Sequence, residues 1–157
     1  MEKSKNLQAF LDMIAVSELG YEVIGGSDNG YNVLVGSTPD NILLFGSYDD
    51  HPRIHNVSLN SDAAGRYQIM SKTFDGYNDR AWKDGTFSPE MQDMYAITLI
   101  KECRALDAIN QGAIEYAVPM VASRWASLPG NSYGQHKQII HDLLSWYMEA
   151  GGKLWSV

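Results

Sequence analysis

The chain has 157 residues, of which 45% are hydrophobic and 20% are charged, and its formal net charge is −7. This length and composition predict one soluble globular domain with a sizeable core. The negative charge, with no two Lys or Arg residues adjacent in the chain, argues against nucleic acid as a partner, because affinity for nucleic acid comes largely from neutralising phosphates.

The cysteine count and the apolar pattern limit the chemistry and the location. Cys103 is the only cysteine, so the sequence predicts neither a disulfide framework nor a metal cluster built on cysteines. The first residues lack the apolar core of a signal peptide, and no stretch approaches 18 apolar residues. We therefore expect a product made in the cytoplasm without a cleaved signal or membrane anchor.

The first predicted element is a helix over residues 4–17. Leu7, Leu11 and Ile14 recur at the spacing of one helical face, and the same spacing continues to Glu18 before Gly20 gives a stop signal. The pattern thus places a carboxyl group at the edge of the core. Desolvation there raises a carboxyl pKa, which suits a general acid near neutral pH. The alternative is that Glu18 frays into water.

Residues 20–63 break the helical period and favour a small antiparallel β-sheet. Two apolar runs, residues 31–35 and 42–45, are flanked by clusters of Gly, Ser, Asn, Asp and Pro. The polar, proline-containing segment 49–53 is predicted to be an exposed loop or lip. Tyr31 and Tyr133 lie next to glycines in predicted loops, where aromatic rings are available to stack on sugars.

The chain is predicted to be helical again from Ala64. A helix starts at the segment Ser88-Pro89-Glu90, and a short helix ends at Gly112. A helix over 114–125 is expected to kink at its proline. A last helix over about 136–149 is expected to point five side chains inward, namely Ile139, Ile140, Leu143, Leu144 and Tyr147. The element order predicts an α+β protein with a cleft between two lobes.

A metal site at His51 and His55 is disfavoured. Their spacing suits ligands on a helix, and Pro52 makes a helix improbable there. The glycines near residue 30 do not open a helix after a strand, so they predict no phosphate site. We expect neither a metal nor a cofactor.

Several blocks in chain order carry a resemblance to a known family. They are residues 8–18, the pairs at 30–31 and 35–36, and residues 50–53, 64–70, 88–89, 125–130, 133–135 and 149–152. Together they resemble the bacteriophage lambda endolysin family of lytic transglycosylases, within the lysozyme-like superfamily. The similarity extends over essentially the whole chain.

The resemblance implies a single lysozyme-like domain over 1–157, with a helical lobe (1–19 and 64–157) and a β insertion (about 20–63). It implies that Glu18 is the single catalytic acid and that Tyr67 and Gln68 belong to the cleft wall. Tyr133 and Gln135 match a second, mobile lip, and we add Tyr31 as a substrate-binding residue. The sequence departs from the family pattern at the Leu19-Gly20 pair, at Asn32 and in residues 38–45, which leaves local cleft shape open.

The implied activity is cleavage of peptidoglycan glycan strands with formation of 1,6-anhydro-muramic ends during phage lysis. The implied protein is a monomer that reaches the wall after a holin permeabilises the membrane. One alternative is a muramidase that uses water, with Asp28, Asp49 or Asp50 as its second carboxylate. Another is a wall-binding phage module without catalysis.

Overall fold

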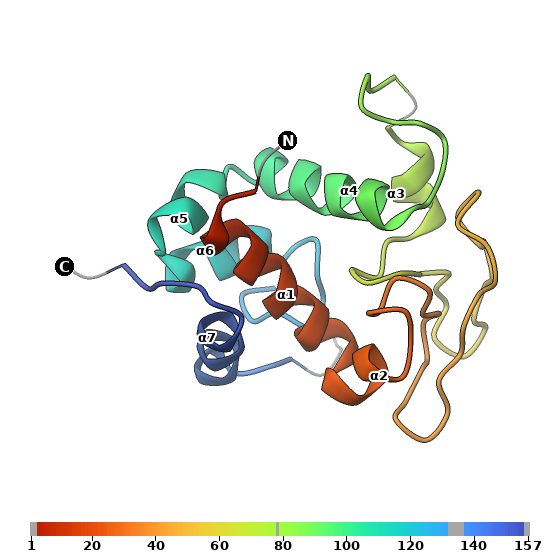
Figure 1. The fold of residues 1–157 in the computed structure, drawn as a ribbon, viewed down its shortest axis with the longest axis horizontal. Coiled ribbons are helices and arrows are strands. Elements are labelled where there is room, and N and C mark those ends of the chain that lie inside the picture. The colour runs from red at the N-terminus through yellow and green to blue at the C-terminus, as the bar shows by residue number, and fades with distance from the viewer. Residues whose placement is uncertain (1–2, 78, 132–136, 156–157) are drawn as a thin grey trace. The chain divides into compact units, whose positions relative to one another are not determined.

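Helices make up most of the regular structure in the computed structural model, which describes residues 3–77, 79–131 and 137–155 (Figure 1). In chain order they are α1 (Lys5–Leu19), α2 (Tyr21–Gly25), α3 (Ser71–Asp75), α4 (Pro89–Glu102), α5 (Leu106–Gln111), α6 (Ile114–Val121) and α7 (Ile140–Glu149). Among the described residues, no helix combines the length and apolar character needed to cross a membrane.

The first predicted helix is confirmed as α1, which continues past its expected end and includes Glu18. At its start, the Ser4 hydroxyl accepts a hydrogen bond from the Leu7 amide at 3.0 Å, which satisfies one of the free amides of the first turn. Its apolar stripe is at most 2% exposed and comprises Leu7, Leu11 and Ile14. Gly20 ends the helix with φ +81°, a conformation that glycine adopts without a Cβ clash.

The predicted β-sheet is not confirmed in the described residues. After the unexpected short helix α2, residues 26–70 form turns with isolated antiparallel bridges, such as Val33 to Leu44. The Ser37 hydroxyl gives a physical reason, because it accepts from the Leu43 amide at 2.9 Å and donates to a nearby backbone carbonyl at 2.8 Å. A side chain thus takes backbone groups that a longer strand ladder would use.

The helix signals after residue 88 are confirmed. The Ser88 hydroxyl accepts from the Met91 amide at 3.2 Å at the start of α4, and Gly112 caps α5 with φ +83°. Pro119 lies within α6, but this helix ends at Val121 and not at residue 125 as predicted.

Two other helical predictions are wrong. Residues 64–70 and 79–88 are not helical. In the first of these ranges Gln68 has φ +51°, whereas a right-handed helix requires a negative φ. The last helix begins at Ile140 and not near residue 136, because Ile139 is extended with ψ 148°. Ile139 and Ile140 are exposed and Leu144 is half-buried, while Leu143 and Tyr147 are buried as predicted.

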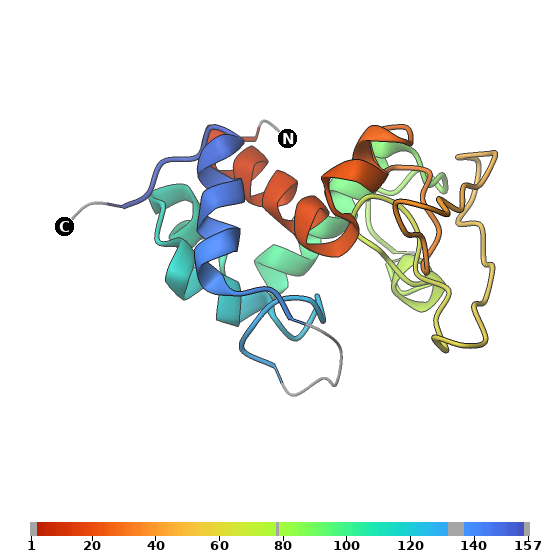
Figure 2. The same ribbon diagram turned by 90° about the horizontal axis from the view of Figure 1, so that it is seen from below.

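The chain divides into two compact units, one formed by Met1–Ser17 with Ile97–Val157 and the other by Glu18–Ala96. In the first unit, α6 contacts both α5 and α7, and α7 lies beside the first turns of α1 (Figure 2). The second unit has an aromatic core that includes Phe45, Phe74, Phe87 and Tyr95. A single domain with a cleft between two lobes stays a prediction.

Candidate active site

Glu18 lies in the last turn of α1 and is half-buried. The residue before it is fixed by polar contacts within the first unit. The Ser17 hydroxyl lies 2.7 Å from the Ser127 hydroxyl, and the Ser17 carbonyl accepts from Nε2 of Gln138 at 3.3 Å. The backbone that leads into Glu18 is therefore held in place, as a catalytic carboxyl group requires.

The residue after Glu18 is held by a close approach within the second unit. A Cβ atom added at Gly30 would lie 2.9 Å from Cδ1 of Leu19 and 3.2 Å from Cγ of Arg66. Gly30 also has φ +85°, which L side chains rarely adopt. Only glycine fits here, and it lets the Leu19 and Arg66 side chains both approach the backbone of residue 30.

Tyr31 and Tyr67 converge on one buried carboxylate. Their hydroxyls donate to the same Oδ1 atom of Asp93, at 2.9 Å and 2.6 Å respectively. Burial, followed by the charge of Asp93, raises the pKa of Tyr31 to about 12 and that of Tyr67 well above its ordinary value. Both hydroxyls therefore stay protonated and act as donors at neutral pH.

Arg66 completes this network. Its guanidinium lies over the rings of Tyr31 and Tyr67, 5.6 Å and 5.5 Å from their centroids, and donates to the Tyr67 hydroxyl at 3.2 Å. The Arg66 backbone amide donates to Oε1 of Gln92 at 3.0 Å. Because Arg66, Gln92 and Asp93 are all buried, these charge-assisted bonds give the cluster one defined geometry.

Gln68 follows this network on a half-buried turn. Its Nε2 donates to the Gly65 carbonyl at 2.9 Å and to the Val33 carbonyl at 3.4 Å. Since the amide nitrogen is used on the backbone, Oε1 is the end of the side chain that can accept from a ligand. Tyr67, by contrast, is 0% exposed, and its direct contact with a sugar stays a prediction.

Tyr133 and Gln135 lie outside the described residues. The segment that precedes them is well anchored, because Nδ2 of Asn131 donates to the Ala122 and Leu128 carbonyls at 2.8 Å and 2.9 Å.

The three candidates for a second carboxylate, Asp28, Asp49 and Asp50, are exposed. Asp28 accepts a hydrogen bond from the Tyr48 hydroxyl, and Asp50 pairs with Arg53 at 3.3 Å. His51 is buried, with one ring nitrogen 2.8 Å from the Ile69 carbonyl and the other 3.0 Å from the Arg53 amide. Within the described ranges, no group of three or more His, Cys, Asp or Glu side chains is placed to hold a metal ion.

The buried carboxylate Asp93 and its chain neighbour Gln92 were not predicted as site residues. The sequence does carry a pattern that would have found them, because Gln92 and Asp93 precede Ala96 and Ile97 by four residues on the buried face of α4. The interruption of an apolar stripe by a polar residue led to Glu18, and the same reasoning applied to α4 leads to Asp93.

Solved structures of lambda lysozyme share the fold that holds these residues. Lambda lysozyme complexed with a chitohexasaccharide matches with a TM-score of 0.86 and 39% sequence identity, covering 98% of this chain and 99% of that one. A second structure, lysozyme from bacteriophage lambda, gives 0.81 and 38% with the same coverage. The fold is therefore lysozyme-like and mostly helical.

Sequence comparison then gives the family. The endolysin family model matches residues 8–154. The endolysin of Escherichia phage lambda is 40% identical, covering 97% of this chain and 95% of its own, and that of Escherichia phage P2 is 38% identical, covering 94% of each. The chain belongs to the endolysin family, as its sequence motifs predicted.

Proposed function

We propose that this protein degrades peptidoglycan as a lytic transglycosylase, cleaving between N-acetylmuramic acid and N-acetylglucosamine. Membership of the endolysin family and the likeness to a lysozyme complexed with a chitohexasaccharide support a glycan substrate. The observation that carries the proposal is the half-buried Glu18 in the last turn of α1, with Ser17 before it and Leu19 after it both held by contacts.

Glu18 serves first as an acid and then as a base. Its protonated carboxyl gives a proton to the oxygen that leaves the muramic anomeric carbon. The resulting carboxylate takes the proton of the muramic 6-hydroxyl, whose oxygen bonds to that carbon and closes the 1,6-anhydro ring. Because this nucleophile belongs to the substrate, its effective molarity is high and no water needs activation.

A single carboxyl is sufficient for this route. Glycosidases that use water commonly need a second one, ~5–5.5 Å away in retaining and ~6.5–9.5 Å away in inverting enzymes. All three candidates for this second carboxyl are exposed; Asp28 accepts from the Tyr48 hydroxyl and Asp50 pairs with Arg53. These engagements support the transglycosylase over the muramidase, which remains the alternative together with a wall-binding module without catalysis.

We propose that Gln68 accepts a hydrogen bond from the substrate acetamido group and that Tyr31 is a further substrate-binding residue. Two lips, residues 50–57 and 128–135, would close over the glycan, with Tyr133 and Gln135 on the second. The first lip carries Ile54 and Val57, which are 51% and 84% exposed and offer apolar surface to a sugar ring.

The Glu18→Gln variant tests the proposal. Glutamine keeps the shape of the side chain but delivers no proton, so we expect lysis of outer-membrane-stripped cells to slow by about 10²–10⁴-fold. Glu22→Gln is the matched control, because Glu22 is an exposed glutamate four residues further on. Clearance by folded Glu18→Gln at the rate of Glu22→Gln would exclude Glu18 as the acid.

We further propose that the protein acts as a monomer and reaches the wall from the cytoplasm through lesions made by a holin. Expression of this chain alone should then leave cells intact, and added chloroform should lyse them. Prompt lysis without a permeabilising agent contradicts this route.

A further inference from the structure

The base of the first lip is fastened to the core of the second unit by one histidine. The His51 side chain is buried at 2% exposure although its neighbours Asp50 and Arg53 are exposed. Its ring centroid lies 4.8 Å from that of Phe87 and 5.9 Å from that of Phe74. This corrects the expectation of a wholly exposed loop over 49–53.

The contacts of His51 require one form of its ring. Nε2 faces the Ile69 carbonyl at 2.8 Å, and a carbonyl only accepts, so Nε2 carries the proton. Nδ1 faces the Arg53 backbone N–H at 3.0 Å, so Nδ1 is the acceptor. The neutral ring satisfies both contacts, whereas the imidazolium has two N–H groups and no acceptor. Protonation would therefore set Nδ1–H against the Arg53 N–H.

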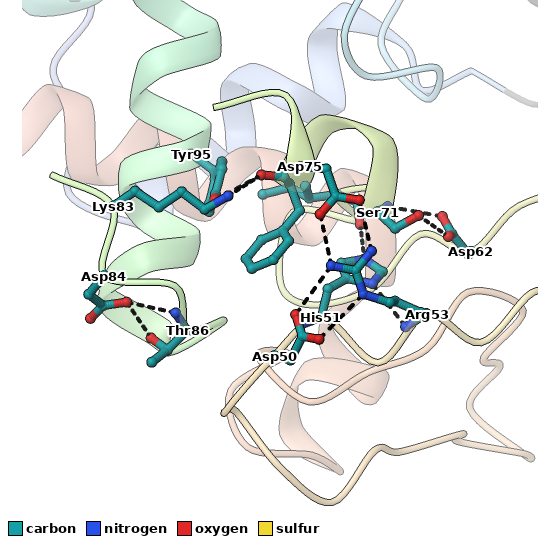
Figure 3. Close-up of polar contacts among 12 residues, drawn as sticks. Asp50, His51, Arg53, Asp62, Ser71, Asp75, Lys83, Asp84, Thr86 and Tyr95 are labelled. Atoms are coloured by element: carbon teal, nitrogen blue, oxygen red, sulfur yellow. Dashed lines mark hydrogen bonds and ion pairs between the residues drawn. The ribbon is translucent and has the colours of Figure 1, made fainter. Parts of the chain in front are cut away.

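Arg53 transmits this contact to the lip. Its backbone has φ +54°, an uncommon conformation for a residue with a side chain, and residues 54–57 continue from it. Its guanidinium donates to both carboxylate oxygens of Asp75 at 2.8 Å and lies 5.6 Å from the Phe74 centroid (Figure 3). The side chain of Arg53 is thus held by Asp75 on α3, and its backbone amide is held by His51.

We propose that His51 and Arg53 form a clamp that positions the first lip for glycan binding, and that the clamp closes only while His51 is neutral. This inference rests on the proposed function, because it assigns the first lip to the glycan. His51 and Arg53 are positioning residues, since they act through Ile54 and Val57.

Charged groups face His51 from each element that packs around it, and Figure 3 shows them. These groups are Asp50 and Arg53 on its own segment, Asp62, which accepts from Ser71, and Asp75 on α3. Lys83 lies near α3, where its Nζ donates to the Phe74 carbonyl at 2.7 Å. The three carboxylates favour the imidazolium, and the Arg53 cation opposes it.

Burial is the largest effect and lowers the pKa of His51, although the Ile69 hydrogen bond and the carboxylates act in the opposite direction. Hydrogen bonds from Arg53 lower the pKa of Asp75, and those from Ser71, against the opposing effect of burial, lower that of Asp62, so both carboxylates stay ionised while His51 titrates. A group whose pKa is lowered on folding stabilises the folded form above its unfolded pKa of about 6.5. The clamp is therefore complete above that pH and is lost as the pH falls through the folded pKa.

The test measures the lip and the ligand separately. Dissociation constants for chitohexaose are measured from about pH 8 to about pH 5 in the Glu18→Gln background, which prevents turnover, and hydrogen exchange of residues 53–57 is followed without ligand. The ring signals of His51 in NMR spectra report its titration. Because only the neutral form is competent, the dissociation constant should rise about tenfold per pH unit below the pKa of His51, and lip exchange, corrected for its intrinsic pH dependence, should rise with it.

Two variants carry the same change from histidine to asparagine, one in the clamp and one as a control. His51→Asn keeps an acceptor near Nδ1 but does not titrate, so the pH dependence of binding should disappear. His141→Asn changes an exposed histidine on α7, outside both lips, and should leave the pH dependence unchanged. If His51→Asn does not fold, the wild-type ring titration and lip exchange still decide the question.

The clamp is refuted if His51 titrates with no change in lip exchange, or if lip exchange rises while chitohexaose affinity stays constant. The proposed function fails independently, because full lytic activity of Glu18→Gln would overturn it and leave the ligand-free exchange result intact.

Discussion

Replacing Tyr67 by phenylalanine should destabilise the protein more than an ordinary loss of a tyrosine hydroxyl. The Tyr67 ring is 0% exposed, and its hydroxyl donates to the Asp93 carboxylate at 2.6 Å and accepts from Arg66 at 3.2 Å. Hydrogen bonds to charged groups contribute about 1.5–3 kcal/mol. Tyr31 still donates to Asp93, so the carboxylate keeps one partner, and we expect a loss of ~2 kcal/mol in the free energy of unfolding.

Tyr95→Phe is the matched comparison. Tyr95 is also 0% exposed, and its hydroxyl donates at 3.1 Å to the neutral Phe74 carbonyl, which keeps a bond from Lys83. Its loss should cost only about 0.5–1.5 kcal/mol. Urea unfolding measures the loss in the free energy of unfolding for both variants. In a thermal melt, the Tm of Tyr67→Phe should be lower than that of the wild type by ~4–8 °C. Equal losses for the two variants would refute the charged network around Asp93.

Two further substitutions test the support of the site. Gly30→Ala places a Cβ against Leu19 and Arg66 at φ +85°, so it should cost more than ~1 kcal/mol in stability and reduce lysis, whereas Gly25→Ala, with nothing within 4 Å of its Cβ, should leave lysis unchanged. Tyr133→Ala should raise KM for peptidoglycan and let some hydrolysed product form; an unchanged KM argues against a role of Tyr133 in the second lip.

Local signals made much of the helical framework predictable. Ser88 and Pro89 start α4, and Gly112 ends α5, because capping involves residues adjacent in the chain. The start of α7 was placed too early because nothing local in the pattern distinguishes the extended Ile139 from a helical residue. In residues 26–70, Ser37 takes backbone groups from a potential ladder, a competition that apolar alternation does not reveal.

The sequence makes Glu18 a candidate because a polar residue interrupts an apolar stripe there, and its catalytic role stays a prediction. Asp93 likewise interrupts an apolar stripe on α4. Its hydrogen bonds come from Tyr31 and Tyr67, which lie in distant parts of the chain. His51 could not be predicted as buried, because its partner is the backbone carbonyl of Ile69, 18 residues away. Every residue has a backbone carbonyl, so the residue type at position 69 does not indicate this contact.

The central claim is that Glu18 cleaves the glycan by transglycosylation, and the products formed in water labelled with heavy oxygen test it most directly. Peptidoglycan digested in this water is analysed by mass spectrometry, with Glu18→Gln as the blank. Transglycosylation by Glu18 should give anhydro-muropeptides that contain no label, because the muramic 6-hydroxyl supplies the new bond to the anomeric carbon. Reducing muropeptides that carry one labelled oxygen at that carbon would contradict it and identify a hydrolase.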